Sequence, residues 1–160
     1  MLCVSCVSVN SKLKLDADFR PDGWYGLSKV WGEAMARMYW DKHGIEGISI
    51  RIGTSMGRPP ENFRMLSTWL SGDDLTQLIM QCITVPDIGY MAVWACSNND
   101  RAYWDNTGAG KLGFEPKDNA EDHRETLRAQ GVDVDSPDRG DWEWPEHGGS
   151  FVRMPERPVR

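Results

Sequence analysis

Residues 24–52, WYGLSKVWGEAMARMYWDKHGIEGISIRI, carry the clearest structural signal of the chain. Over residues 24–43, apolar side chains recur at the three- and four-residue spacing of one helical face. That face comprises Leu27, Val30, Trp31, Ala34, Met35 and Met38. The opposite side carries Glu33, Arg37 and Asp41. Gly44 follows as a usual helix terminator, so the pattern predicts an amphipathic helix over about 24–43.

The segments on either side of this helix alternate between strand and helix patterns. Residues 2–7 form a short apolar run, and residues 46–52 place three isoleucines on one side, as a strand does. The later elements predicted are a loop over 53–62, a helix over 73–85 capped by Ser71 or Asp73, a strand over 89–96 and a polar helix over 118–130. This order is typical of an α/β fold with a parallel sheet.

The composition indicates a globular chain that does not bind nucleic acid. The 160 residues are 40% hydrophobic and 26% charged, which fits one soluble domain. A formal net charge of −6 argues against a general binder of phosphate backbones. No apolar run approaches the roughly 18 residues of a membrane span, and the first residues lack the features of a signal peptide. We therefore expect a cytoplasmic protein with no membrane partner.

The four cysteines do not form a metal-ligand pattern. Cys3 and Cys6 have C-x-x-C spacing, but no second pair follows, and the three histidines are scattered. A structural zinc site needs four ligands in paired spacing. No metal site is predicted, and the cysteines are expected to be reduced.

The character of the chain changes after Gly131. Residues 131–160 are rich in Pro, Gly, Asp, Glu and Arg and have almost no periodic apolar pattern. The sequence therefore predicts two parts: a body over 1–130 and a poorly ordered polar tail over 131–160.

Tyr25 and Lys29 are the strongest candidates for chemistry. Four residues of separation place the two side chains one turn apart on the same helical face. An ammonium group beside a phenol favours the ionised phenolate, which makes Tyr25 a candidate general base. The same spacing also occurs by chance in surface helices, so these two residues alone do not define a function.

Several longer segments resemble the extended short-chain dehydrogenases of the NAD-dependent epimerase/dehydratase family, in particular their uronate dehydrogenase subfamily. These segments, within residues 20–125, are RPDGWYGLSK (20–29) with Gly32 and Glu33, SIRIGTS (49–55), RMLSTWLS (64–71) with Asp73 and Asp74, WDN (104–106), LGF (112–114) and PKDNAE (116–121). The resemblance implies a partial Rossmann-like parallel sheet, namely the C-terminal half of the short-chain dehydrogenase fold.

The resemblance also implies roles for individual residues. Tyr25 is expected to accept a proton, and Lys29 to hold the nicotinamide ribose of NAD. Ser55 is expected to contact the cofactor, and Thr54 the substrate. Arg64 is expected to bind the carboxylate of a sugar acid, which suits the fork geometry of a guanidinium group. The implied reaction is the oxidation of the C1 hydroxyl of a hexuronic acid, or a related sugar, to a lactone.

Two features of the family are weak or missing here. The family's catalytic serine corresponds best to Ser5, with Ser8 as the next candidate. No Gly-rich turn follows a strand in the way that dinucleotide binding requires. The resemblance therefore implies that this sequence starts within the family sheet, as a truncated form.

Three functions remain open from the sequence. The first is the dehydrogenase described above, and the second is a nucleotide-sugar epimerase or dehydratase, which would need a longer C-terminal lobe. The third is a catalytically inactive remnant that acts as an assembly module. The amphipathic helices at 24–43 and 73–85 are expected to expose apolar faces and to mediate homo-oligomerisation.

Overall fold

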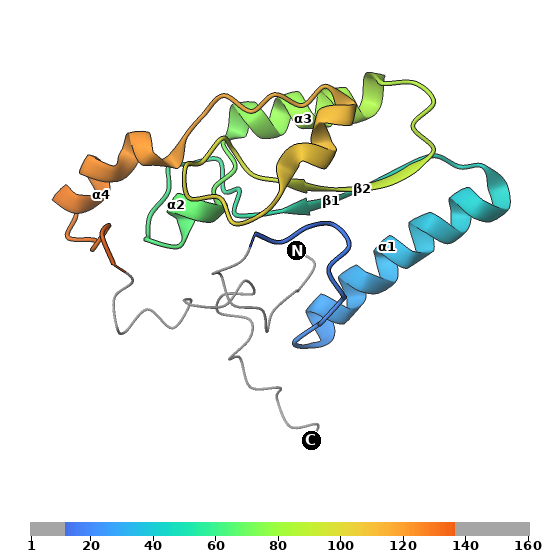
Figure 1. Ribbon diagram of the computed structural model, residues 1–160, viewed down its shortest axis with the longest axis horizontal. Coiled ribbons are helices and arrows are strands. Elements are labelled where there is room, and N and C mark those ends of the chain that lie inside the picture. Colours follow the sequence, from blue (N-terminus) through green and yellow to red (C-terminus); the bar gives the residue numbers. More distant parts are fainter. Residues whose placement is uncertain (1–11, 137–160) are drawn as a thin grey trace.

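The computed structural model describes residues 12–136, in which two parallel strands lie between helices (Figure 1). Strand β1 (Gly47–Ile52) pairs with β2 (Tyr90–Ala95), with Gly47 opposite Tyr90 and Ile52 opposite Ala95. Helix α1 (Trp24–His43) lies on one side of the two strands and α3 (Gly72–Thr84) on the other. The predicted α/β class with a parallel sheet is confirmed. The predicted strand at residues 2–7 lies outside the described residues.

The face of the sheet toward α3 is apolar, because alternate residues of each strand point to it. Ile48, Ile50 and Ile52 of β1 pack there with a buried cluster. Its members are Leu70, Leu78, Val93, Ala95, Ala109, Leu112 and Phe114. Ser71 begins α3 by accepting a hydrogen bond from the Asp74 N–H, so of the two predicted caps Ser71 is the one used.

The face of the sheet toward α1 is more polar than the helix pattern predicts. Glu33 is buried against β1 and pairs with Arg51, whereas Leu27, Trp31 and Met35 are exposed. The helix thus turns part of its polar side inward and leaves the apolar stripe outward. A buried ion pair determines this orientation, because Glu33 and Arg51 each need a partner once removed from water.

Residues 12–20 run beside the strands and cover the edge of this face. Leu13 pairs with the chain at Trp104 through Leu13 N–H to the Tyr103 carbonyl (2.8 Å) and Asp105 N–H to the Leu13 carbonyl (3.0 Å). Leu13 also packs with Trp94, Cys96, Tyr103 and Trp104, whose two tryptophan rings stack at 5.2 Å.

The region after β2 folds back through short helices. A 3₁₀ helix, η1 (Asn106–Leu112), precedes η2 (Ala120–His123) and α4 (Arg124–Ala129). A continuous helix over 118–130 is therefore wrong. The Asp118 N–H donates to the Asp74 carboxylate (3.2 Å), and Asn119 caps the Glu121 N–H, so the helix starts two residues later and in a 3₁₀ turn.

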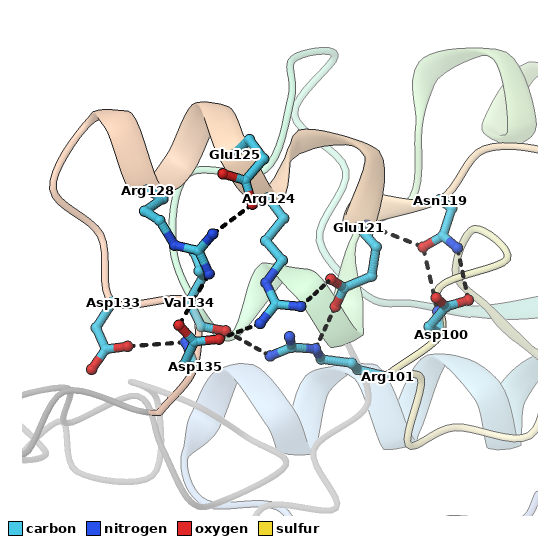
Figure 2. Close-up of polar contacts among 10 residues, drawn as sticks. All are labelled: Asp100, Arg101, Asn119, Glu121, Arg124, Glu125, Arg128, Asp133, Val134 and Asp135. Atoms are coloured by element: carbon cyan, nitrogen blue, oxygen red, sulfur yellow. Dashed lines mark hydrogen bonds and ion pairs between the residues drawn. The ribbon is translucent and has the colours of Figure 1, made fainter.

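Residues 131–136, the start of the segment predicted as a tail, pack on α4. Val134 is buried with Leu66, Trp69, Ala120 and Leu127. Figure 2 shows the polar contacts around it: Arg124 and Arg128 both reach Asp135, and Arg101 donates to the Val134 carbonyl (2.9 Å). Residues 137–160 lie outside the described residues. No helix between residues 12 and 136 is long and apolar enough to cross a bilayer.

Candidate active site

Tyr25 and Lys29 lie together in the first turns of α1, as their spacing predicts. The Lys29 ammonium nitrogen lies 5.0 Å from the centre of the Tyr25 ring. Tyr25 is 49% exposed, and Lys29 is exposed as well, so both polar groups are accessible to a bound molecule. The turn between them is supported by the Ser28 hydroxyl, which donates to the Tyr25 carbonyl (2.7 Å). The pair can therefore act jointly on one small molecule.

The first turns of α1 lie level with the carboxyl end of β1. Helix and strand run in opposite directions, joined by the short turn at residues 44–46 (Figure 1). Glu33 of the helix contacts Arg51 of the strand. From this contact, Lys29 and Tyr25 lie about 6 and 12 Å further along the helix, and Thr54 about 10 Å further along the strand. The topology thus directs Tyr25, Lys29 and Thr54 to one end of the sheet, where ligands bind in α/β folds.

Thr54 is held in place by the segment that follows the loop. Its N–H donates to the Thr68 carbonyl (2.7 Å), and its carbonyl accepts from the Leu70 N–H (2.8 Å). The Thr54 and Thr68 hydroxyls are 2.9 Å apart and share a hydrogen bond. Because Thr68 is fully buried, it fixes the Thr54 hydroxyl from the protein side. Ser55, the next residue, is half-buried.

Arg64 immediately precedes α2 (Met65–Thr68), a short helix that the sequence did not predict. Arg64 is only 5% exposed, so it is not an ordinary surface arginine. Through α2, Arg64 is joined to Thr68 and hence to Thr54. A buried guanidinium group requires anionic or carbonyl oxygen atoms near it, which suits a residue expected to bind a carboxylate.

The described residues fit one end of a dinucleotide better than the other. Tyr25 and Lys29, the two residues expected at the nicotinamide end, are both exposed. For the pyrophosphate, the fold would need a strand, a Gly-rich turn and a helix start in direct succession. Gly108 and Gly110 lie instead inside η1, away from the end of a strand. Ser5 and Ser8 lie outside the described residues, so the place of the catalytic serine stays a prediction.

Cysteine chemistry is not favoured at the two cysteines that the structure describes. Burial raises the pKa of the Cys96 thiol to about 11, and Cys96 also contacts Asn106. Burial also raises the pKa of Cys82. Both thiols are therefore protonated at neutral pH and are poor nucleophiles.

The sequence did not reveal two contacts that shape this region. One is the hydrogen bond between Thr54 and Thr68, and the other is the ion pair between Glu33 and Arg51. The second had a signal, since Arg51 stands between Ile50 and Ile52 in a strand. A charge at such a place requires a buried partner, although the sequence does not say which.

Comparisons with known proteins agree with the resemblance. The chain is 45% identical to uronate dehydrogenase of Agrobacterium fabrum over 90% of its own length and 53% of the relative's. It is 44% identical to uronate dehydrogenase of Pseudomonas syringae pv. tomato, over 89% of the chain and 50% of the relative. The chain thus spans about half the length of the curated relatives it matches. No protein-family model matches it.

A solved structure shows the same arrangement of the chain. The model superimposes on a mutant uronate dehydrogenase from Agrobacterium tumefaciens in complex with NAD, with a TM-score of 0.84 and 42% identity. The superposition covers 93% of this chain and 55% of that one.

Proposed function

We propose that the chain belongs with the uronate dehydrogenases among the extended short-chain dehydrogenases, and that it supplies the catalytic helix and the substrate side of an NAD-dependent sugar-acid dehydrogenase. The reaction is oxidation of the C1 hydroxyl of a hexuronic acid to a lactone. The observation that carries the proposal is the contact between Tyr25 and Lys29 at the end of the sheet where Thr54 lies.

Each residue has a distinct task in this proposal. The Arg64 guanidinium group binds the sugar carboxylate in a bidentate, charge-assisted contact, and the Thr54 hydroxyl binds a hydroxyl of the ring. The Tyr25 phenolate takes the proton of the C1 hydroxyl. The Lys29 ammonium group donates to the nicotinamide ribose. NAD, when bound beside Ser55, provides the acceptor for the hydride that leaves C1.

The experiment that tests this function has two stages. NAD binding to the purified chain is measured first by titration calorimetry. NADH formation from glucuronate or galacturonate is then followed by absorbance. Tyr25→Phe is expected to lower kcat at least a hundredfold while NAD still binds, because the proton acceptor is lost but the helix is not. Tyr39→Phe, an exposed tyrosine on the same helix, is the matched control and should retain full activity.

The role of Arg64 is tested separately. Arg64→Ala is expected to raise KM for the hexuronate at least tenfold with a smaller effect on kcat, because binding of the carboxylate is lost. Arg58→Ala removes an exposed arginine from the neighbouring loop and should leave KM unchanged. An unaltered KM in a well-folded Arg64→Ala variant would contradict the carboxylate role.

A second candidate function is favoured by the exposed apolar face of α1. We propose that this face, with that of α3, associates with a second copy of the chain. In a chain that binds no NAD, such association would be its remaining function, as an assembly module. NAD titration therefore separates the two candidates: binding supports the dehydrogenase, and its absence in a folded chain supports the module.

A further inference from the structure

Arg51 is a charged residue in the middle of a buried face. It lies on β1 and is 3% exposed. Its guanidinium group pairs with the Glu33 carboxylate of α1 through two contacts: Nη2 to Oε1 at 2.7 Å and Nε to Oε2 at 3.1 Å. Glu33 is itself 7% exposed. Bidentate pairing of this kind fixes both distance and orientation, which a single apolar contact does not.

The remaining surfaces of the Arg51 side chain are also occupied. Nη1 donates to the Leu15 carbonyl (3.2 Å). The guanidinium carbon lies 5.1 Å from the centre of the Phe19 ring and 5.2 Å from that of Trp94. One side chain thus joins β1 to α1, to β2 and to residues 15–19, which precede the catalytic helix in the chain.

Other contacts that hold α1 on the sheet lie between Glu33 and the C-terminal end of the helix: the Arg37 guanidinium carbon is 5.5 Å from the centre of the Tyr90 ring, and Trp40 lies against Gly89. Only Gly26 and Glu33 of α1 are buried, and the helix's large apolar side chains are mostly exposed. From β2, the Tyr90 hydroxyl donates to the Glu33 carbonyl (3.4 Å). Helix α3, in contrast, packs Leu75, Leu78 and Cys82 into an apolar cluster. The pair between Glu33 and Arg51 therefore holds α1 on the strands at a point one to two helical turns from Lys29 and Tyr25.

The pair lies between the two parts of the proposed active site. Glu33 is one helical turn from Lys29, and Arg51 precedes Thr54 by three residues, with Thr54 just after the end of β1. A shift of the helix along the strand would separate Tyr25 and Lys29 from Thr54, and would also leave two charges buried without partners. A shift of α1 away from the position in which Glu33 meets Arg51 therefore costs free energy. In that position, Tyr25 and Lys29 lie level with Thr54.

We propose that Glu33 and Arg51 are positioning residues that fix the catalytic helix α1 on β1, so that Tyr25 and Lys29 stay level with Thr54. The catalytic identity of Tyr25 and Lys29 rests on the proposed function. The fixing of the helix does not, and it is measured independently of activity.

The test is amide hydrogen exchange of the full chain, compared between α1 and α3. In the double variant Glu33→Gln/Arg51→Met, both charges are removed together, so neither is left buried alone. The α1 amides are expected to exchange at least tenfold faster than in the unmodified chain, while the α3 amides change less than twofold. Arg51→Lys keeps the charge but loses the bidentate contact, and it should give an intermediate increase in α1 only.

The matched control is Asp41→Asn, which breaks the exposed pair between Arg37 and Asp41 on the same helix. It should leave both helices within twofold of the unmodified exchange rates. Equal acceleration in α1 and α3 would mean that the pair only stabilises the fold as a whole, and unchanged α1 exchange would mean that it does not hold the helix. Either result overturns the proposal. If the double variant does not fold, the exchange rates of the α1 and α3 amides in Arg51→Lys test the proposal in the same way.

A second readout links the helix to the site. Where the unmodified chain binds NADH, its dissociation constant, measured from NADH fluorescence, should rise at least fivefold in the double variant. Arg51→Lys should recover part of that loss. Unaltered affinity in a variant with faster α1 exchange would overturn the link to the site. Failure of the unmodified chain to bind NADH would count against the proposed function, and the exchange comparison would still decide whether the pair positions α1.

Discussion

Gly53 separates Arg51 and Ile52 of β1 from the proposed substrate residue Thr54, and its lack of a side chain lets two segments meet there. A Cβ atom at this position would overlap the Thr68 carbonyl oxygen and lie 2.5 Å from Cζ3 of Trp104. The same Thr68 carbonyl accepts the Thr54 N–H, so the close approach is also the contact that fixes Thr54. At the residue scale, the position of Thr54 depends on the lack of a Cβ atom at Gly53 as well as on hydrogen bonds.

Gly53→Ala should therefore destabilise the chain by about 2 kcal/mol or more, since overlap with backbone atoms can be relieved only by moving a strand or a loop. Urea denaturation followed by tryptophan fluorescence measures the change. Gly110→Ala is the control, because a Cβ there meets no atom within 4 Å. An unchanged denaturation midpoint for Gly53→Ala would mean that the approach of Thr68 to Gly53 is looser than described.

At the scale of the elements, Asp74 connects the start of α3 to the end of β2 and to the loop before η2. Its carboxylate accepts hydrogen bonds from the Ser97 hydroxyl (2.6 Å), the Lys117 N–H (2.8 Å) and the Asp118 N–H (3.2 Å). The Ser97 hydroxyl oxygen in turn accepts from the Ser71 N–H (2.9 Å). One buried carboxylate thus satisfies three donors from two segments, which an acceptor-only group can do.

Asp74→Asn should cost about 2 kcal/mol of stability, because the new amide NH₂ group faces a donor and leaves it unsatisfied in the interior. Thermal or urea unfolding measures this cost. Asp73→Asn changes the adjacent, exposed residue in the same helical turn and should cost no more than about 0.5 kcal/mol. Similar losses of stability in Asp74→Asn and Asp73→Asn would show that Asp74 stabilises the fold through its charge near the start of α3, and not through its hydrogen bonds.

The sequence predicts the longer elements well, because their periodicity is local information. The helix over 24–43 and the strand over 46–52 agree with α1 and β1 within one residue. The break at Asp118 depends on Asp74, which lies far away in the chain, and α2 is too short to have a period. The site residues likewise fall into those that local spacing predicts and those that depend on contacts with distant residues. Tyr25 and Lys29 share one turn and are predictable, whereas the orientation of Glu33 depends on a strand residue.

The segment at residues 131–136 is attached to α4 by the buried Val134 and by ion pairs of Asp135, and so part of its attachment should depend on pH. The pKa of Asp135 is lowered by hydrogen bonds from Arg124 and Arg128 (Figure 2). That of Asp133 is lowered by a hydrogen bond from the Ser136 hydroxyl. A carboxylate whose pKa is lower in the folded state stabilises that state fully above its ordinary pKa of 3.8. The contribution is lost as the pH falls below that value.

We expect acid to release this segment before the sheet unfolds. On titration from pH 5 downward, the methyl NMR signals of Val134 should move before those of Val93, which is buried at the centre of the sheet. Asp135→Asn should displace the Val134 signals already at pH 5, because its two arginine contacts are weakened. Simultaneous movement of both valines would indicate that residues 131–136 unfold only with the whole domain. The pairs are exposed, so the effect is expected to be local.

At the scale of the whole molecule, two apolar surfaces of the described chain face outward. On α1, the exposed members include Leu27, Trp31, Met35 and Met38, which follow the spacing of one helical face. On α3, Met80 and Ile83 are exposed. Stable monomers rarely expose a continuous apolar face along a helix of this length. The predicted homo-oligomer would cover at least the first of these surfaces.

Trp31 is the residue whose change should test this most directly, because it lies mid-helix and is 67% exposed. The unmodified chain should sediment with a mass above the 18.1 kDa of a monomer, and Trp31→Glu should shift it toward the monomer, since a charge buried in an apolar interface lacks a partner. Met56→Glu, at an exposed methionine in the loop that follows β1, should leave the mass unchanged. A monomeric unmodified chain with cooperative unfolding would contradict self-association. A shift caused equally by Met56→Glu would mean that general apolar exposure, and not the face of α1, drives it.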